Sequence, residues 1–247
     1  VAAVDCFSER TVLRCMRCGT LQMRPQVGQE QLERYFEDEY FEEKEPSYWG
    51  HRREPIFAQI ADSLREQGVT SVLDIGSGYG HLVAYLDRRG FRATGCDLSA
   101  EAVRAGRKAL QVDIRMATVE ELQLSRRDAL TLIDTLYYLP DPEAHLLACR
   151  RHCSPGGILL LRVRNPDGLF TRQGLPCPHL WGFSPDGLIE LLDRTGWETE
   201  HVAPGGASRH ATRAPRMALR TVNRTVRSVR PSTGIWTHSY HVIARRS

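Results

Sequence analysis

Apolar residues alternate between two patterns, helical spacing and short continuous runs, from about residue 56 onward. Residues 56–64 carry apolar side chains three and four positions apart and Gly68 follows, so a helix that stops there is predicted. Residues 158–163 are apolar except at Arg162, which is typical of a strand buried on both faces. The same patterns predict strands at residues 72–75, 91–97, 114–117, 129–134, 197–202 and 235–244.

Capping residues mark where the helices between these strands begin. Ser99 can cap a helix that runs to about residue 110. Asp141-Pro142 has the order of an N-cap and a first helical residue, and Ser184-Pro185 has the same order. With a further helix at residues 81–89, strands and helices alternate, which predicts an α/β fold with an open, doubly wound sheet.

The strand at residues 72–75 runs into a glycine-rich turn, Gly76-Ser77-Gly78-Tyr79-Gly80, and Asp74 lies two residues before the first glycine. Glycines permit a tight strand-to-helix turn and let the backbone approach a ligand closely, and the following helix offers free N–H groups. A second acid, Asp97, ends the next predicted strand roughly 20 residues downstream, where a ribose-binding carboxylate is expected. Together these features frame a site for a nucleotide-bearing cofactor.

The charge and spacing of this turn distinguish between cofactors. A dinucleotide would place its diphosphate beside the carboxylate of Asp74, which would repel it, and the turn reads GxGxG rather than GxGxxG. S-adenosylmethionine has no phosphate and carries an ammonium and a sulfonium, so Asp74 would attract it, while Asp97 accepts hydrogen bonds from two ribose hydroxyls. S-adenosyl-L-methionine is therefore the expected cofactor.

With these motifs the sequence resembles the class I S-adenosylmethionine-dependent methyltransferases over roughly residues 50–247. The resemblance implies a Rossmann-like sheet of seven strands with the last strand antiparallel, and a glycine turn that cradles the methionine part of the cofactor. It also places Thr118 and Val119 beside the adenine. The cofactor contacts that it implies are Asp74, Gly76, Ser77, Gly78, Asp97, Leu98, Thr118, Val119 and Asp134.

The loop after the fourth strand of the domain departs from the family, because Tyr137 and Tyr138 stand where many relatives have a Glu-His pair. The family's His is a frequent candidate base in enzymes that methylate small molecules. We expect Tyr138, Tyr137 and His179 to be the catalytic residues. A tyrosine with a pKa near 10 is a poor base at neutral pH, so a phenol would orient an acceptor that is already nucleophilic or is deprotonated by His179. His145 and His152 are interpreted as surface or packing residues.

Residues 1–50 are interpreted as an N-terminal segment that precedes the cofactor-binding domain at residues 51–247. Cys15 and Cys18 have the CxxC spacing of half a zinc ribbon, but a second pair is missing and Cys6 is a poor substitute. We therefore expect a metal half-site and no complete zinc site. The chain begins with Val rather than Met, so a first pair would lie upstream.

In relatives a Tyr-rich acidic segment like residues 35–41 closes over the cofactor. By this resemblance, lid or carboxylate contacts are expected from Tyr40, Tyr48 and Arg52.

Composition narrows the class of protein. The chain has 247 residues, of which 41% are hydrophobic, enough for one sizeable core. No apolar run approaches the ~20 residues of a membrane span, and the order of a signal peptide is missing at the N-terminus. The seven cysteines are scattered, which suits a reducing compartment. A cytoplasmic enzyme is therefore expected.

The net charge of +3 is distributed unevenly along the chain. Acidic residues dominate residues 30–45, whereas the residues after Glu200 include many arginines and no Asp or Glu. A helix opened by Pro215 would gather its arginines on one side. A packed cap with a solvated arginine face is favoured over a surface for RNA, phosphate or membranes.

Three functions remain open. The first and preferred one is methyl transfer to oxygen, nitrogen or carbon of a small molecule, in secondary metabolism or on a sugar, by a monomer or homodimer. The second is an RNA methyltransferase, for which the C-terminal arginines would contact phosphates, although no Asn-Pro-Pro-Tyr-type motif occurs. The third is a cofactor-binding protein with lost or altered activity.

Overall fold

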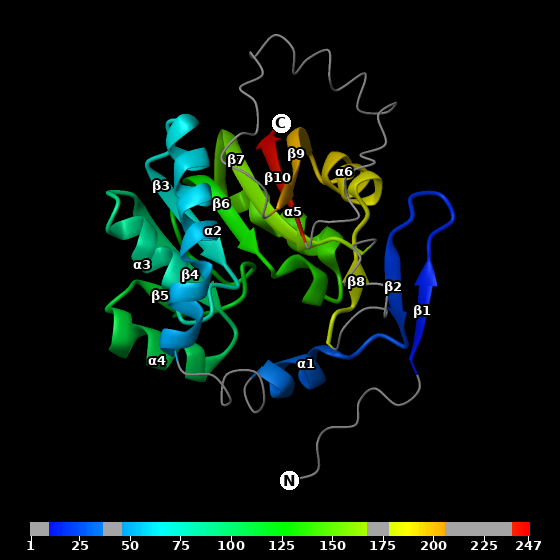
Figure 1. Ribbon diagram of the computed structural model, residues 1–247, viewed down its shortest axis with the longest axis horizontal. Coiled ribbons are helices and arrows are strands. Elements are labelled where there is room, and N and C mark those ends of the chain that lie inside the picture. Colours follow the sequence, from blue (N-terminus) through cyan, green and yellow to red (C-terminus); the bar gives the residue numbers. More distant parts are fainter. Residues whose placement is uncertain (1–9, 37–45, 167–177, 206–238) are drawn as a thin grey trace.

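The computed structural model describes residues 10–36, 46–166, 178–205 and 239–247 (Figure 1). Within these residues the main sheet has seven strands in the order β5-β4-β3-β6-β7-β10-β9. They are β3 (Ser71–Ile75), β4 (Arg92–Asp97), β5 (Ile114–Met116), β6 (Arg127–Ile133), β7 (Cys153–Arg164), β9 (Trp197–Gly205) and β10 (Ser239–Arg246). The pairs from β5 to β7 are parallel, and β10 is antiparallel to β7 and β9. The predicted doubly wound sheet with an antiparallel last strand is confirmed.

Helices cover both faces of this sheet. They are α2 (Pro46–Glu66), α3 (His81–Asp87), α4 (Ala100–Leu110), α5 (Pro142–His152) and α6 (Pro185–Arg194). Successive residues of a strand point to opposite faces. In β7, Ile158 and Leu160 pack with α2, α3 and α4, whereas Leu159 and Leu161 pack with α5 and α6. Both faces need apolar residues, which explains the apolar run in the sequence.

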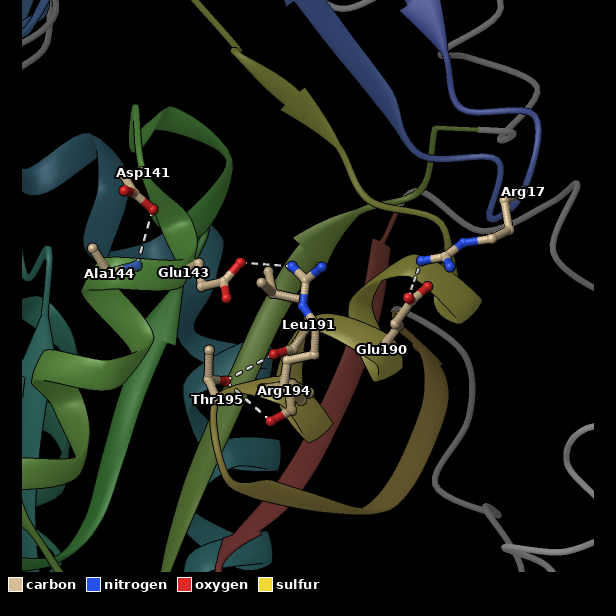
Figure 2. Close-up of polar contacts among 9 residues, drawn as sticks. Arg17, Asp141, Glu143, Ala144, Glu190, Leu191, Arg194 and Thr195 are labelled. Carbon is tan, nitrogen blue, oxygen red and sulfur yellow. Dashed lines mark hydrogen bonds and ion pairs between the residues drawn. The ribbon is translucent and has the colours of Figure 1, made fainter.

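The predicted helix starts are confirmed at the level of hydrogen bonds. The side chains of Ser99, Asp141 and Ser184 each accept a hydrogen bond from the backbone N–H three residues later, at 3.1, 2.9 and 3.0 Å respectively. Figure 2 shows this cap at the start of α5, where Asp141 reaches the N–H of Ala144. These caps fix the directions in which α4, α5 and α6 leave the carboxyl edge of the sheet.

A second sheet joins the N-terminal region to a segment far along the chain. It consists of β1 (Thr11–Arg14), β2 (Leu21–Arg24) and β8 (Trp181–Gly182). Leu21 and Gln22 pair with β8, and the hairpin turn forms an ion pair from Arg17 to Glu190 on α6 (Figure 2). The predicted domain boundary at residue 50 lies inside α2, which begins at Pro46.

Several sequence predictions lie outside the described residues. They concern Cys6, Tyr40, the helix after Pro215 and residues 235–238 of the last strand. The helices of the described segments include none that is both long enough and apolar enough to cross a membrane.

Candidate active site at the carboxyl edge of the sheet

A cavity of about 710 Å³ opens where β3, β4, β5 and β6 end. This volume lies within the range of small-molecule sites, about 300–1,000 Å³, and the carboxyl edge of an open α/β sheet is where ligands bind. Leu32 and Phe36, from and just after α1 (Gln29–Tyr35), and Arg53 and Phe57 from α2 also line it. The cavity therefore combines the edge of the sheet with elements from the N-terminal region.

The glycine turn at one wall of the cavity has the backbone that only glycine adopts easily. Gly76 has φ +72° and Gly78 has φ +53°. The N–H groups of Gly76 and Ser77 donate to the carbonyl of Cys96 at 2.9 and 3.0 Å, which ties the turn to β4. A Cβ on Gly76 would lie 2.4 Å from Oγ1 of Thr135, so the turn is closely packed against the loop after β6.

Asp97 ends β4 beside this turn and lines the cavity. Its Oδ2 accepts a hydrogen bond from the N–H of Gly78 at 2.7 Å, and its Oδ1 accepts one from Ser99 at 3.0 Å. Burial raises the pKa of Asp97, and these N–H donors oppose that rise. The carboxylate is thus held in place with both oxygens fixed before any ligand binds.

Asp74, predicted as the acid of the turn, is 3% exposed and lines the same cavity. Burial raises its pKa to about 7, although the hydroxyl of Thr131 donates to its Oδ1 at 2.6 Å and works against the shift. A second cause of the rise is the negative charge of Asp97. Asp74 therefore changes its protonation near neutral pH.

Asp134 follows β6 with φ +60°, a conformation in which a residue other than glycine is strained. Its Oδ2 forms ion pairs with Arg162 of β7 and, at 3.4 Å, with Arg53 of α2. Its Oδ1 is buried and has no hydrogen-bond partner among the described residues. Asp134 and Arg53 both line the cavity.

The loop after β5 forms the far end of the cavity. Thr118 and Glu121 bond each other: the N–H of Thr118 donates to Oε2 of Glu121 at 3.0 Å, and the N–H of Glu121 donates to Oγ1 of Thr118 at 3.3 Å. Val119 is buried, and Leu98 lines the cavity from the end of β4. All nine predicted cofactor contacts therefore lie on the cavity wall.

The three predicted catalytic residues form one aromatic cluster, but they lie at different depths. Tyr138, in a 3₁₀ turn (Leu136–Tyr138), lines the cavity, and its ring meets that of Phe36 edge to face with centroids 5.1 Å apart. Tyr137 is 4% exposed and stacks on His179 at 4.1 Å, and neither ring lines the cavity. Burial raises the pKa of Tyr137 and lowers that of His179 to about 3.

The cavity residues that the sequence analysis missed include His145 and Arg53. The interpretation of His145 as a surface or packing residue was wrong, because its side chain lines the cavity. Arg53 lines it as well, whereas the sequence analysis named the neighbouring Arg52, whose side chain lies outside the description, as does that of Tyr48. His152 does pack inside the protein, where its Nε2 lies 2.7 Å from the carbonyl of Val119.

Cys15 and Cys18 lie at the turn of the β1–β2 hairpin, outside the cavity at the carboxyl edge. The pKa of Cys15 is lowered because backbone N–H groups of Cys18 and Arg17 donate to its sulfur. The described segments contain no group of three or more His, Cys, Asp and Glu side chains that could hold a metal ion. The half-site at Cys15 and Cys18 stays a prediction.

A doubly wound sheet with this turn and an acid at the end of the neighbouring strand defines a Rossmann-like fold of the methyltransferase type. Comparison with known families matches residues 43–202 to the methyltransferase domain, and the chain belongs to this family. The predicted resemblance is confirmed.

Sequence relatives are similar over slightly less than half of the chain. A ubiquinone biosynthesis O-methyltransferase of Xanthomonas oryzae pv. oryzae is 34% identical over 123 residues, which cover 47% of this chain and 52% of that protein. The enzyme of the same name from Alkalilimnicola ehrlichii is 39% identical over 114 residues, covering 42% and 46%. The chain thus spans about half the length of these curated relatives.

Solved structures show the same fold at low sequence identity. A magnesium protoporphyrin IX methyltransferase from Synechocystis, solved with bound S-adenosylmethionine, superposes with a TM-score of 0.60 at 14% identity, covering 88% of this chain and 96% of that one. A methyltransferase from Thermotoga maritima gives a TM-score of 0.60 at 16% identity, covering 88% and 99%. At these identities the likeness concerns the fold.

Proposed function

We propose that this chain transfers the methyl group of S-adenosylmethionine to a hydroxyl oxygen of a small molecule. The observation that carries the proposal is the charge of the cavity. Its described lining holds six carboxylates and one arginine, Arg53. This balance suits a ligand with an ammonium and a sulfonium and repels the phosphates of a dinucleotide.

The positions of the acids agree with the parts of this cofactor. In this proposal Asp97 binds the ribose. Asp74, Asp134 and Arg53 bind the ammonium and the carboxylate of the methionine part, and the loop at Thr118 and Val119 binds the adenine. The sheet order β5-β4-β3-β6 arranges these three regions in a line. An elongated ligand can therefore lie across the strand ends.

The cofactor supplies a methyl carbon that the sulfonium has already activated. The protein must align an acceptor with it and exclude water. Tyr138, Phe36 and Leu139 bound the remaining part of the cavity and give it an apolar wall with one phenol. His179 is a weak base because burial lowers its pKa to about 3, so Tyr138 is the catalytic residue and His179 supports it through the aromatic cluster.

Oxygen as the accepting atom is supported by the names of the sequence relatives, which are O-methyltransferases. The test is incubation of the protein with methyl-labelled S-adenosylmethionine and either a metabolite extract or total RNA. Labelled products are then identified by mass spectrometry. A labelled methyl ether in the metabolite arm is expected; labelled RNA alone would contradict the proposal. An acceptor from secondary metabolism remains our prediction.

Replacement of Tyr138 with Phe should lower turnover at least ~10-fold, about 1.4 kcal/mol of activation free energy, with cofactor affinity unchanged. The reason is that the phenol hydroxyl orients the acceptor while the ring packing against Phe36 stays. The matched control is Tyr85→Phe on α3, a buried tyrosine outside the cavity lining. Full activity of Tyr138→Phe on the identified acceptor would show that the phenol takes no part.

Cofactor binding should release protons near pH 7. Burial raises the pKa of Asp74 to about 7 in the free protein, so part of this carboxyl is protonated, and the positive charges of the cofactor favour its ionised form. Calorimetric titrations at pH 7 in buffers of different ionisation enthalpy measure the released protons. Asp74→Asn should abolish the dependence of the measured binding enthalpy on the buffer. Equal proton release by wild type and Asp74→Asn would rule out this carboxyl as the source.

A further inference from the structure

Thr131 lies in β6, the strand beside β3, and is paired in register with Asp74 (Figure 1). Its hydroxyl donates a hydrogen bond of 2.6 Å to Oδ1 of Asp74. Thr131 is 0% exposed and is not among the described residues that line the cavity at the carboxyl edge, whereas Asp74 is. Any effect of Thr131 on a ligand in this cavity is therefore exerted through Asp74.

The hydroxyl of Thr131 stands at a position that otherwise suits an apolar residue. Ala129 and Ile133 lie two residues before and after it on β6, point to the same face of the sheet and are buried in the apolar core. Valine has nearly the same shape as threonine and also favours strands. A hydroxyl that is removed from water costs free energy unless it forms a hydrogen bond. The hydroxyl is therefore tolerated here because Asp74 accepts its hydrogen.

The hydrogen bond also acts on the charge of Asp74. An ionised carboxylate only accepts hydrogen bonds, so a donated hydroxyl favours the ionised form over the protonated one. Burial of Asp74 acts in the opposite direction and raises its pKa to about 7. Without the hydroxyl of Thr131 this pKa would lie higher still, and less of the side chain would be ionised at neutral pH.

The charged groups around Asp74 come from the elements on either side of it. The negative charge of Asp97, at the end of β4, raises the pKa of Asp74, and the positive charge of Arg53 on α2 lowers it. Arg53 also approaches Asp134, which follows β6. Other titratable side chains that line the cavity at the glycine turn and at the end of β4 are Tyr79, His81 and Cys96. Thr131 differs from these groups because it favours the ionised form of Asp74 without adding a charge of its own.

We propose that Thr131 is a positioning residue for the cofactor: its hydroxyl holds the side chain of Asp74 at the cavity wall and favours the ionised form, which attracts the ammonium of the methionine part. The inference rests on the proposed function, in which Asp74 takes part in binding that ammonium. A protonated carboxyl carries no charge to attract it. Loss of the hydroxyl should therefore weaken binding mainly at pH values where Asp74 is incompletely ionised.

The test measures the affinity for S-adenosylhomocysteine by calorimetry between about pH 6 and about pH 8.5. This ligand has the ammonium, the ribose and the adenine of the proposed cofactor and lacks the reactive methyl group. In wild type the affinity should rise through pH 7, because Asp74 with a pKa of about 7 becomes ionised in this range.

Thr131→Val removes the hydroxyl and keeps the shape of the side chain. The midpoint of the rise in affinity should move up by about one pH unit, and the affinity at pH 7 should fall about fivefold. At about pH 8.5 the variant should come within about twofold of wild type, because Asp74 is then mostly ionised in both proteins. A loss of packing alone would lower the affinity equally at every pH. Thr131→Ser, which keeps the hydroxyl, should retain the wild-type midpoint.

The matched control is Thr199→Val on β9. Thr199 is buried, lies outside the described lining of the cavity, and its hydroxyl has no hydrogen-bond partner among the described residues. Its substitution removes a buried hydroxyl without touching Asp74, so the dependence of affinity on pH should match that of wild type.

The outcomes separate the inference from the proposed function. An unshifted midpoint in Thr131→Val, or a loss of affinity that is the same at every pH, would overturn the role of Thr131 and leave the proposed function standing. A wild-type affinity that does not change across this pH range would do the same. Failure of wild type to bind S-adenosylhomocysteine at all would overturn both. Thr131→Ala, a second variant without the hydroxyl, should show the same shift and serves if Thr131→Val folds poorly.

Discussion

Replacement of Asp97 with Ala should weaken the binding of S-adenosylmethionine by ~2–3 kcal/mol, which is roughly a 30–150-fold loss of affinity. The carboxylate is fixed by the N–H groups of Gly78 and Ser99, so its oxygens need no further ordering when they accept hydrogen bonds from the two ribose hydroxyls. Charge-assisted hydrogen bonds of this kind are the stronger ones. Calorimetric titration measures the change.

Two further variants serve as controls for the predicted loss of affinity. Asp186→Ala removes an exposed carboxylate from the first turn of α6, outside the cavity, and should leave the affinity unchanged. Asp97→Asn keeps the shape of the side chain and one acceptor oxygen, and its affinity should lie between wild type and Asp97→Ala. Unchanged affinity in both Asp97 variants would show that this carboxylate does not hold the ribose.

The fold could be predicted because its signals are local. Continuous apolar runs specify strands covered on both faces, and cap residues such as Ser99 and Asp141 specify where helices leave the sheet. The glycine turn is equally local, since its positive φ angles and the acid before it follow one another in the sequence. The residues that these features predict lie together on the wall of one cavity.

The remaining parts of the site depend on contacts between distant segments. The pairing of Leu21 and Gln22 with β8 involves a strand of two residues and carries no sequence pattern of its own. Tyr137 and Tyr138 are neighbours in a 3₁₀ turn and point to different surroundings, so the sequence could not say which phenol meets the cavity. His145 was also missed because the contact that it makes is with a distant segment: His145 lies on α5, whereas its partner Glu120 lies in the loop after β5.

The ion pairs of Asp134 form another set of distant contacts, and they have a consequence for stability. The side chains of Asp134 and Arg162 are 10% and 17% exposed, and Arg162 reaches Asp134 from the neighbouring strand β7. Arg53 also approaches the same oxygen, at 3.4 Å. Taking both charges out of water is costly, so the pair stabilises the fold only while both partners are present.

Replacement of Arg162 with Met should therefore lower the free energy of unfolding by about 3 kcal/mol, because it leaves the carboxylate of Asp134 in a buried, strained position with one partner fewer. Adding Asp134→Asn to Arg162→Met should recover part of the loss, since the uncompensated charge is then gone. Urea unfolding measures the free energy of unfolding of wild type, the single variant and the double variant.

The control is Arg92→Met, the same substitution at an exposed position of β4, which should change the free energy of unfolding by less than ~0.5 kcal/mol. If Arg162→Met proves as stable as Arg92→Met, or the double variant is no more stable than the single one, the charge of Asp134 does not depend on Arg162.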